Sequence, residues 1–136
     1  MIRLFYIAGR YRHVNPDGTY DLDAMAAEVQ DEQRWARVIA ECGHMWFAPL
    51  SNSVFMEDPH VFQDEDEFVR RDLSVIGVMR AEYDHILMRD GWSDEPISVG
   101  ANAEREAALA RGIVEATTMH GADALREYIR SLNGVS

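Results

Sequence analysis

The chain has 136 residues, of which 47% are apolar and 27% charged, and its formal net charge is −11. This length and composition predict one folded domain over residues 1–136 and exclude a largely disordered chain. The excess of acid repels phosphate backbones, so we expect neither a nucleic-acid polymer nor a membrane surface as partner. A small anion remains compatible, because a helix N-terminus binds one whatever the net charge.

Stretches of apolar residues predict the strands of a sheet. Residues 2–8 form an apolar and aromatic run closed by Gly9, which indicates a central strand buried on both faces. Further strands are predicted at residues 44–50, 83–88 and 113–117. Helices are predicted from about residue 23 to Gly43, from Asp64 onward, from Ser98 to about 111, and from about 122 to 132, with a loop at 51–63.

Strands that alternate with helices indicate an α/β fold, in which helices cover both faces of a mostly parallel sheet of about four or five strands. Ligands of such sheets bind beyond the carboxyl ends of the strands. We expect the loop at residues 9–13, the loop after the second strand and the stretch 89–104 to converge there.

The single cysteine, Cys42, allows no disulfide within the chain and favours a reducing compartment. The N-terminal apolar run is too short for a signal peptide, and no run approaches the ~18 residues of a membrane span, so we expect a cytoplasmic protein. The histidines lack the spacing of a metal site, and no GxGxxG or Walker sequence is present. We therefore expect neither a metal nor a cofactor.

The segment Ser98-Val-Gly-Ala-Asn-Ala-Glu104 places a hydroxyl, a glycine and a carboxylate in the first turns of one helix. Ser98 and the free backbone amides can hold an anion, and Gly100 lets the backbone approach a ligand. Glu104 lies six residues further on, where its side chain can point back toward the helix N-terminus. A serine cap followed by a solvated glutamate explains the same residues without a ligand.

Several motifs occur in one order along the chain: Tyr6-Ile-Ala-Gly, Trp46-Phe-Ala-Pro, Arg71-Asp-Leu, Asp84-His-Ile-Leu-Met, Gly91-Trp and Ser98-x-Gly-Ala-x-x-Glu104-x-x-x-Ala108. In this order they resemble the nucleoside 2-deoxyribosyltransferase-like superfamily. The most similar branch is that of small bacterial and phage proteins of the DUF4406 type, which is related to the nucleoside 5'-monophosphate N-glycosidases. The resemblance covers residues 2 to about 116 and implies a flavodoxin- or Rossmann-like three-layer sandwich.

The resemblance also implies a catalytic set. Glu104 matches a helix glutamate that attacks the anomeric carbon, giving a covalent ribosyl-enzyme that water or a second base resolves. A carboxylate suits this chemistry, because the transition state has oxocarbenium character. Asp72 matches the family aspartate at the base, and Tyr6 matches a first-strand tyrosine that orients the nucleophile. Without the resemblance, Asp72 is equally a solvated or capping residue, and Tyr6 a core aromatic.

Substrate binding is expected around the start of the same helix. Ser98 stands where the family's transferases tend to carry an aspartate and its monophosphate hydrolases a phosphate-binding serine, which favours a 5'-phosphate. Arg10 and Arg12 can supplement it by charge-assisted hydrogen bonds, although arginines in exposed loops are usually only solvated. The predicted substrate-binding residues are Gly9, Arg10, Arg12, Ser98, Gly100 and Asn102.

The sequence therefore predicts an N-glycosidase or 2-deoxyribosyltransferase that acts on a nucleoside or nucleoside 5'-monophosphate, with hydrolysis of a monophosphate preferred because of Ser98. One alternative is a noncatalytic nucleotide-binding module of the same fold. Another is a phosphotransfer or flavin protein. This chain, however, lacks the acidic cluster or the hydroxyl-rich loop that such proteins carry after the first strand. We expect a homodimer or higher homo-oligomer, with Trp46 and Trp92 as interface aromatics.

Overall fold

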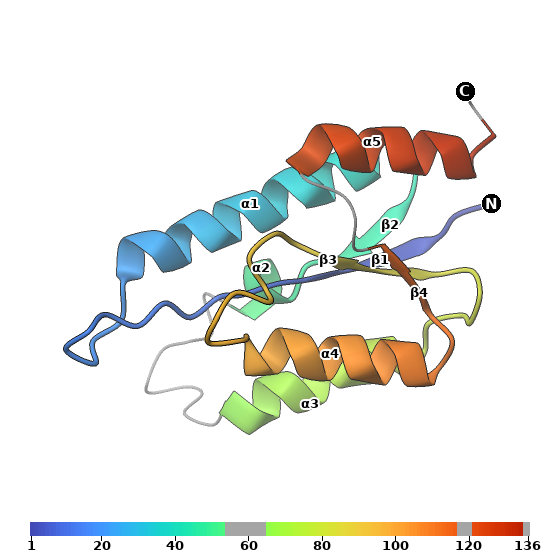
Figure 1. Ribbon diagram of the computed structural model, residues 1–136. Helices are drawn as coiled ribbons and strands as arrows, with labels where there is room; N and C mark the ends of the chain where they lie inside the picture. The colour runs from blue at the N-terminus through green and yellow to red at the C-terminus, as the bar shows by residue number, and fades with distance from the viewer. Residues whose placement is uncertain (54–64, 117–120, 135–136) are drawn as a thin grey trace.

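A parallel sheet lies between two layers of helices in the computed structural model, which describes residues 1–53, 65–116 and 121–134 (Figure 1). The elements in chain order are β1 (Leu4–Ala8), α1 (Leu22–Glu41), β2 (Met45–Phe47), α2 (Pro49–Ser53), α3 (Glu65–Ile76), β3 (His85–Met88), α4 (Val99–Ala110), β4 (Val114–Ala116) and α5 (Gly121–Leu132). The described strands form one four-stranded sheet in the order β2-β1-β3-β4, and every pairing is parallel.

The predicted α/β class, with its flavodoxin- or Rossmann-like arrangement, is confirmed. The first strand is also central, as its apolar run predicts. Tyr6 of β1 lies between Phe47 of β2 and Ile86 of β3, so β1 is hydrogen-bonded along both edges. Helices α1 and α5 cover one face of the sheet, and α3 and α4 cover the other (Figure 1).

Side chains of β1 alternate between two cores, as strand geometry requires. Phe5 and Ile7 pack on the face covered by α1 and α5, whereas Tyr6 and Ala8 pack on the face covered by α3 and α4. The first core includes Trp35, Val38, Ile39, Leu87, Leu125 and Ile129, and the second includes Ile76, Met79, Ile86, Met88, Ala101 and Ala108. This alternation directs Tyr6 toward the helices that carry Asp72 and Glu104.

Side-chain caps and one glycine set the ends of the helices that border the site. Asp21 accepts a hydrogen bond from the amide of Ala24 at 3.0 Å and begins α1. Ser98 accepts one from the amide of Ala101 at 3.3 Å and begins α4, which confirms the predicted cap. Gly43 follows α1 with φ of 83°, a conformation that favours glycine, so it stops this helix as predicted.

The prediction of a strand over residues 44–50 is wrong beyond Phe47. Pro49 begins the short helix α2 instead, and the predicted loop at 51–63 therefore starts with helix up to residue 53. Proline suits the first position of a helix, since its fixed φ is helical and it lacks an amide hydrogen. The carboxylate of Glu32 accepts the amides of Leu50 and Ser51 and so stabilises this turn.

Some sequence predictions fall outside the described residues. They include the rest of the predicted loop, residues 54–63, and the predicted helix start at Asp64. Cys42 is half-buried, although its apolar neighbours predict a buried thiol.

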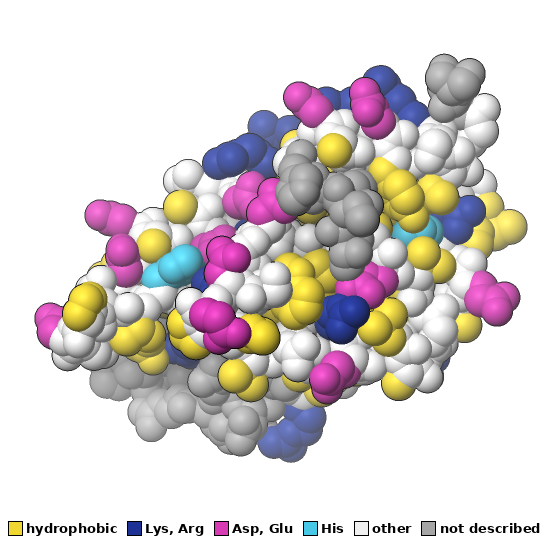
Figure 2. All heavy atoms as spheres, in the orientation of Figure 1, with side chains coloured by type: hydrophobic (Ala, Val, Ile, Leu, Met, Phe, Trp, Pro, Cys, Tyr) yellow, Lys and Arg dark blue, Asp and Glu magenta, His cyan; other side chains and the backbone are white. Residues whose placement is uncertain are grey.

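Within the described ranges, no helix is long and apolar enough to cross a membrane. Acidic side chains are dispersed over the face seen in Figure 2, where they do not form a single patch.

Candidate active site

The predicted catalytic residues come from three different elements. Tyr6 lies on β1 and is fully buried, Asp72 lies on α3 and is half-buried, and Glu104 lies on α4 with 8% of its surface exposed. The charge on Asp72 raises the pKa of both Glu104 and Tyr6, so the three side chains occupy one electrostatic environment. Elements distant in sequence thus bring together the residues that the resemblance singles out.

The two carboxyl groups hold their protons unusually well. Burial, followed by the charge of Asp72, raises the pKa of Glu104 to about 8. Burial, followed by the charge of Glu32, raises the pKa of Asp72 to about 6. Like charges that share a poorly solvated region resist simultaneous ionisation. Between about pH 6 and pH 8 this pair therefore retains one proton, mainly on Glu104.

The Tyr6 hydroxyl is a buried polar group without a hydrogen-bond partner among the described residues. The hydroxyl nevertheless lies close enough to Glu104 to lower the pKa of that group as a hydrogen-bond donor does, against the larger effects of burial and of the charge on Asp72. Burial and the charges of Glu104 and Asp72 raise the pKa of Tyr6 far above its usual value, so the hydroxyl stays protonated. A buried hydroxyl without a hydrogen bond lowers the free energy of unfolding by roughly 1–3 kcal/mol, a cost that active sites tolerate.

The start of α4 has the features expected of an anion site. Ser98 is half-buried and uses its oxygen, not its hydroxyl hydrogen, to accept the Ala101 amide. A methyl group built on Gly100 would meet nothing within 4 Å, so this glycine leaves open space above the first turn. The partial positive charge of a helix N-terminus favours an anion in such a place.

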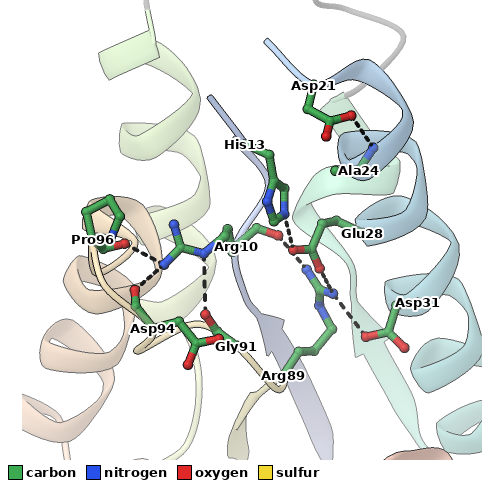
Figure 3. Close-up of polar contacts among 10 residues, drawn as sticks. All are labelled: Arg10, His13, Asp21, Ala24, Glu28, Asp31, Arg89, Gly91, Asp94 and Pro96. Atoms are coloured by element: carbon green, nitrogen blue, oxygen red, sulfur yellow. Dashed lines mark hydrogen bonds and ion pairs between the residues drawn. The ribbon is translucent and has the colours of Figure 1, made fainter. Parts of the chain in front are cut away.

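Arg10 holds two loops together. Its guanidinium donates hydrogen bonds to the backbone carbonyls of Gly91 at 3.3 Å, Asp94 at 2.6 Å and Pro96 at 2.5 Å (Figure 3). These contacts tie the loop after β1 to the loop that leads into Ser98. The structure thus gives Arg10 a role in shaping the approach to α4, which the sequence argument does not foresee.

Two other predicted binding residues contact neighbours in their own segments. The guanidinium of Arg12 lies 5.2 Å from the centre of the Tyr20 ring and donates to the Tyr20 hydroxyl at 2.9 Å. Asn102 donates to the carboxylate of Glu106, one turn further along α4, at 3.3 Å. Both residues thus have partners outside the catalytic set.

Arg89 is the principal residue that the sequence argument misses. It directly follows β3 and is fully buried. Its guanidinium donates to Glu28 at 3.0 Å, to Asp31 at 3.1 Å and to the carbonyl oxygen of Arg10 at 3.0 Å (Figure 3). Its Nε has no hydrogen-bond partner within the described part of the chain. The sequence signal is a cation immediately after an apolar strand, at the end where ligands bind.

Gly9 gives the Arg89 guanidinium its space. A methyl group on Gly9 would lie 2.6 to 2.7 Å from three atoms of that group, closer than packed atoms approach. The sequence argument assigns Gly9 to substrate binding, and the structure adds a packing reason for the glycine. His13, in the same loop, contacts Glu28 at 2.7 Å and extends the network around Arg89 (Figure 3).

Glu32 is the second residue missed from the sequence. Its side chain is fully buried, and its carboxylate accepts hydrogen bonds from the amides of Leu50 and Ser51 and from the Ser51 hydroxyl. The available signal is its position on α1, seven residues after Met25 and three before Trp35, which places an acid on the buried stripe of the helix.

A surface hollow of about 420 Å³ lies apart from these residues and is lined by Arg3, Cys42, His44, Tyr83 and Asn133, among others. Both ring nitrogens of His44 are occupied, one by the amide of Arg3 and the other by Asn133. The hollow therefore offers no free histidine, and we assign the candidate site to the residues around Glu104. Among the described residues, no group of three or more potential ligands is arranged to hold a metal ion.

No protein-family model matches the chain, and no curated protein matches it either.

The packing of Gly9 against Arg89 predicts a contrast between two glycines. Gly9→Ala should lower the free energy of unfolding by about 1–3 kcal/mol, because the guanidinium is held by hydrogen bonds and cannot yield freely. Gly100→Ala adds a methyl group in open space inside a helix and should leave stability equal or up to about 1 kcal/mol higher. Urea denaturation measures both, and equal effects would contradict this packing account.

The raised pKa of Glu104 predicts a stability cost that grows with pH. The folded protein retains this proton up to about pH 8, whereas a free glutamate loses it near 4.5. The folded state therefore binds more protons between these values, and its stability falls as pH rises through this window. Glu104→Gln removes the ionisable group and should be more stable than the parent protein at pH 8, by roughly 2–4 kcal/mol, with a smaller gain at pH 5.

The matched control is Glu106→Gln, which changes an exposed glutamate on the same helix. Its difference in unfolding free energy from the parent protein should stay constant between pH 5 and pH 8. If the gain for Glu104→Gln were also independent of pH, the buried, protonated state of Glu104 would be wrong.

Proposed function

We propose that this protein cleaves or transfers the N-glycosidic bond of a nucleoside or nucleoside 5'-monophosphate, with Glu104 as the nucleophile. The observation that carries the proposal is the shared environment of Glu104, Asp72 and Tyr6, which come from three elements: after burial, the charge of Asp72 raises the pKa of both Glu104 and Tyr6, and Tyr6 and Glu104 affect each other. The motif resemblance supplies the reaction class. The geometry supports it because a nucleophile and a second titratable carboxyl group are both required.

The reaction needs one protonated carboxyl group and one ionised carboxylate. Together, Asp72 and Glu104 hold this combination near neutral pH. With pKa values of about 8 for Glu104 and about 6 for Asp72, the proton resides mainly on Glu104 in the free protein. Its transfer to Asp72 leaves Glu104 ionised and Asp72 acidic. Each carboxyl group then has the protonation state that its role requires.

In the first step a Glu104 oxygen forms a bond to the anomeric carbon, and the bond from that carbon to the base nitrogen breaks. The bonding electrons go to the base, and the proton on Asp72 neutralises it. In the second step water or another base attacks the anomeric carbon and releases Glu104. The Asp72 carboxylate accepts the proton that the attacking group loses.

Tyr6 is proposed to orient the nucleophile. Its hydroxyl is buried beside Glu104 and remains protonated, so it can donate a hydrogen bond to the carboxylate when that group ionises. A donor beside the carboxyl group favours its ionised, reactive form over the protonated form.

The N-terminus of α4 is proposed to bind a 5'-phosphate. The open space above Gly100, the hydroxyl hydrogen of Ser98 and the helix dipole all favour an anion at this place. Arg10 contributes by fixing the loop that enters the helix. A cytoplasmic location, and a homo-oligomer with Trp46 and Trp92 at its interface, stay predictions.

Replacement of Glu104 tests the proposed reaction. Glu104→Gln keeps the size of the side chain but cannot supply the attacking carboxylate, so release of free base should fall by at least about a thousandfold. Chromatography of nucleosides and nucleoside 5'-monophosphates, incubated with and without a second free base, measures the release and separates hydrolysis from transfer. Glu106→Gln should retain full activity. Base release by Glu104→Ala near the parent rate would refute the nucleophile assignment.

Substitutions of Ser98 test the phosphate site. Ser98→Ala should lower kcat/KM for the monophosphate by about tenfold to more than a hundredfold, since a hydrogen bond to a charged group is worth roughly 1.5–3 kcal/mol. The nucleoside should be nearly unaffected. Ser98→Asp keeps a good helix cap but repels a phosphate, so it should reverse the preference in favour of the nucleoside. Equal losses on both substrates would make Ser98 only a structural cap.

A further inference from the structure

Helix α5 is joined to the sheet through two histidines. The helix packs against α1 on one face of the sheet (Figure 1). Its fully buried side chains are Leu125 and Ile129. The hydroxyl of Tyr128, on the helix, contacts Nε2 of His85 at 2.9 Å. Asn133, directly after the helix, contacts Nε2 of His44 at 2.8 Å. The docking of α5 therefore depends on the state of two imidazole rings.

The hydrogen bonds of His44 fit only a neutral ring. Its Nδ1 accepts the backbone amide of Arg3 at 3.0 Å, and an amide can only donate, so this nitrogen carries no proton. Nε2 must then carry the proton and donate it to the side-chain oxygen of Asn133. His44 is buried. A second proton on the ring would set two N–H groups against each other and break the contact with Arg3.

His85 is also held in a place that suits a neutral ring. It is buried at the start of β3, and its Nδ1 is a buried atom without a hydrogen-bond partner among the described residues. A charged imidazole donates from both nitrogens, whereas Tyr128 occupies only Nε2. Charging His85 would therefore bury a donor without an acceptor, which is costly in the folded state.

The groups around His85 favour the neutral ring on balance. Burial, followed by the charge of Arg3, lowers the pKa of His85 to about 4. The carbonyl of Tyr83 and the charge of Asp84 act in the opposite direction. The Tyr83 carbonyl already accepts a hydrogen bond from Arg3, and the Asp84 carboxylate accepts several from Arg80. Neither group is thus free to compensate fully for a charge on His85.

The two histidines also oppose each other's ionisation. Both rings pack on Phe5 of β1, with ring centres 5.1 Å away for His85 and 5.4 Å away for His44. A charge on His44 disfavours a charge on His85, as expected for like charges in a poorly solvated region. The ion pair that joins α5 to α1, Arg126 with Glu41, is partly exposed and stabilises the docked helix only slightly.

We propose that His44 and His85 form an acid-sensitive latch for α5: the two neutral rings hold the helix on the sheet, and their protonation releases it while α3 and α4 stay docked on the other face. The histidine latch is independent of the proposed function, because it lies on the face of the sheet opposite Tyr6. It assigns a conformational role to two buried histidines that the proposed reaction does not use.

The direction of the effect follows from proton binding. A histidine released into water binds a proton near pH 6.5, whereas His85 in the docked state binds one only near pH 4. Between these values the released state binds more protons, so the docked state loses stability as pH falls from 6.5 toward 4. Above pH 6.5 the latch contributes its full stabilisation.

Amide hydrogen exchange of the whole protein, followed by NMR at pH 7 and pH 4.5, tests the proposal. After correction for intrinsic exchange rates, the opening constant of the α5 amides should rise by about tenfold to a hundredfold at the lower pH. The α4 amides, on the other face, should show no such rise. An unchanged opening constant in α5, or an equal rise in α4, would overturn the latch.

Two substitutions separate the latch from other effects of acid. His85→Gln keeps a donor for the Tyr128 hydroxyl but cannot take up a proton, so most of the pH dependence of α5 exchange should disappear. His13→Gln is the matched control, because His13 contacts Glu28 away from α5 and its substitution should leave the pH dependence of the parent. Full pH dependence in His85→Gln, or its loss in His13→Gln, contradicts the proposal.

The parent protein provides a second measurement should His85→Gln fail to fold. The imidazole nitrogen signals should show a titration midpoint for His85 near pH 4 and, at neutral pH, a His44 ring with its proton on Nε2. A midpoint for His85 at or above pH 6.5, or a proton on Nδ1 of His44, would overturn the proposal.

Discussion

Burial of the Arg89 guanidinium orders the edge of the sheet at which the candidate site lies. A charged group without access to water needs hydrogen-bond partners, and Arg89 finds them on Glu28, Asp31 and the backbone of Arg10. These partners fix α1 against the loop after β1, and Gly9 is the residue that allows the close approach. Arg10 then extends the same constraint to the loop that begins α4.

The buried, hydrogen-bonded guanidinium of Arg89 explains in part how acidic side chains can share a poorly solvated region. The positive charge of Arg89 offsets part of the repulsion, and the donors on α2 stabilise Glu32. The remaining excess of negative charge keeps a proton on the pair formed by Asp72 and Glu104. Such a pair carries a stability cost, and sites of chemistry are where proteins retain costs of this kind.

Local signals in the sequence predict most of the fold. The apolar run before Gly9 predicts the central strand, Ser98 predicts the start of α4, and Gly43 predicts the end of α1, because each depends on its immediate neighbours. The second strand is shorter than predicted since Pro49 starts a helix that Glu32, distant in sequence, stabilises.

The site could be predicted only in part, for a similar reason. The motif order points to Tyr6, Asp72 and Glu104 only through the resemblance, and that assignment stays a prediction. The ion pairs of Arg89 join residues about sixty positions apart. A lone charged residue on a buried face gives no indication of its partner in a single sequence. The role of Arg10 as a link between loops likewise depends on backbone carbonyls, whose positions only the folded chain defines.

The central claim is that the Glu104 carboxylate attacks the anomeric carbon, and mass spectrometry of the protein quenched during turnover tests it most directly. The account predicts a transient adduct with the mass of the sugar, or of the sugar phosphate, on the peptide that contains Glu104, and its loss in Glu104→Gln. An adduct on a different residue, or base release at the parent rate by Glu104→Gln, would contradict the account.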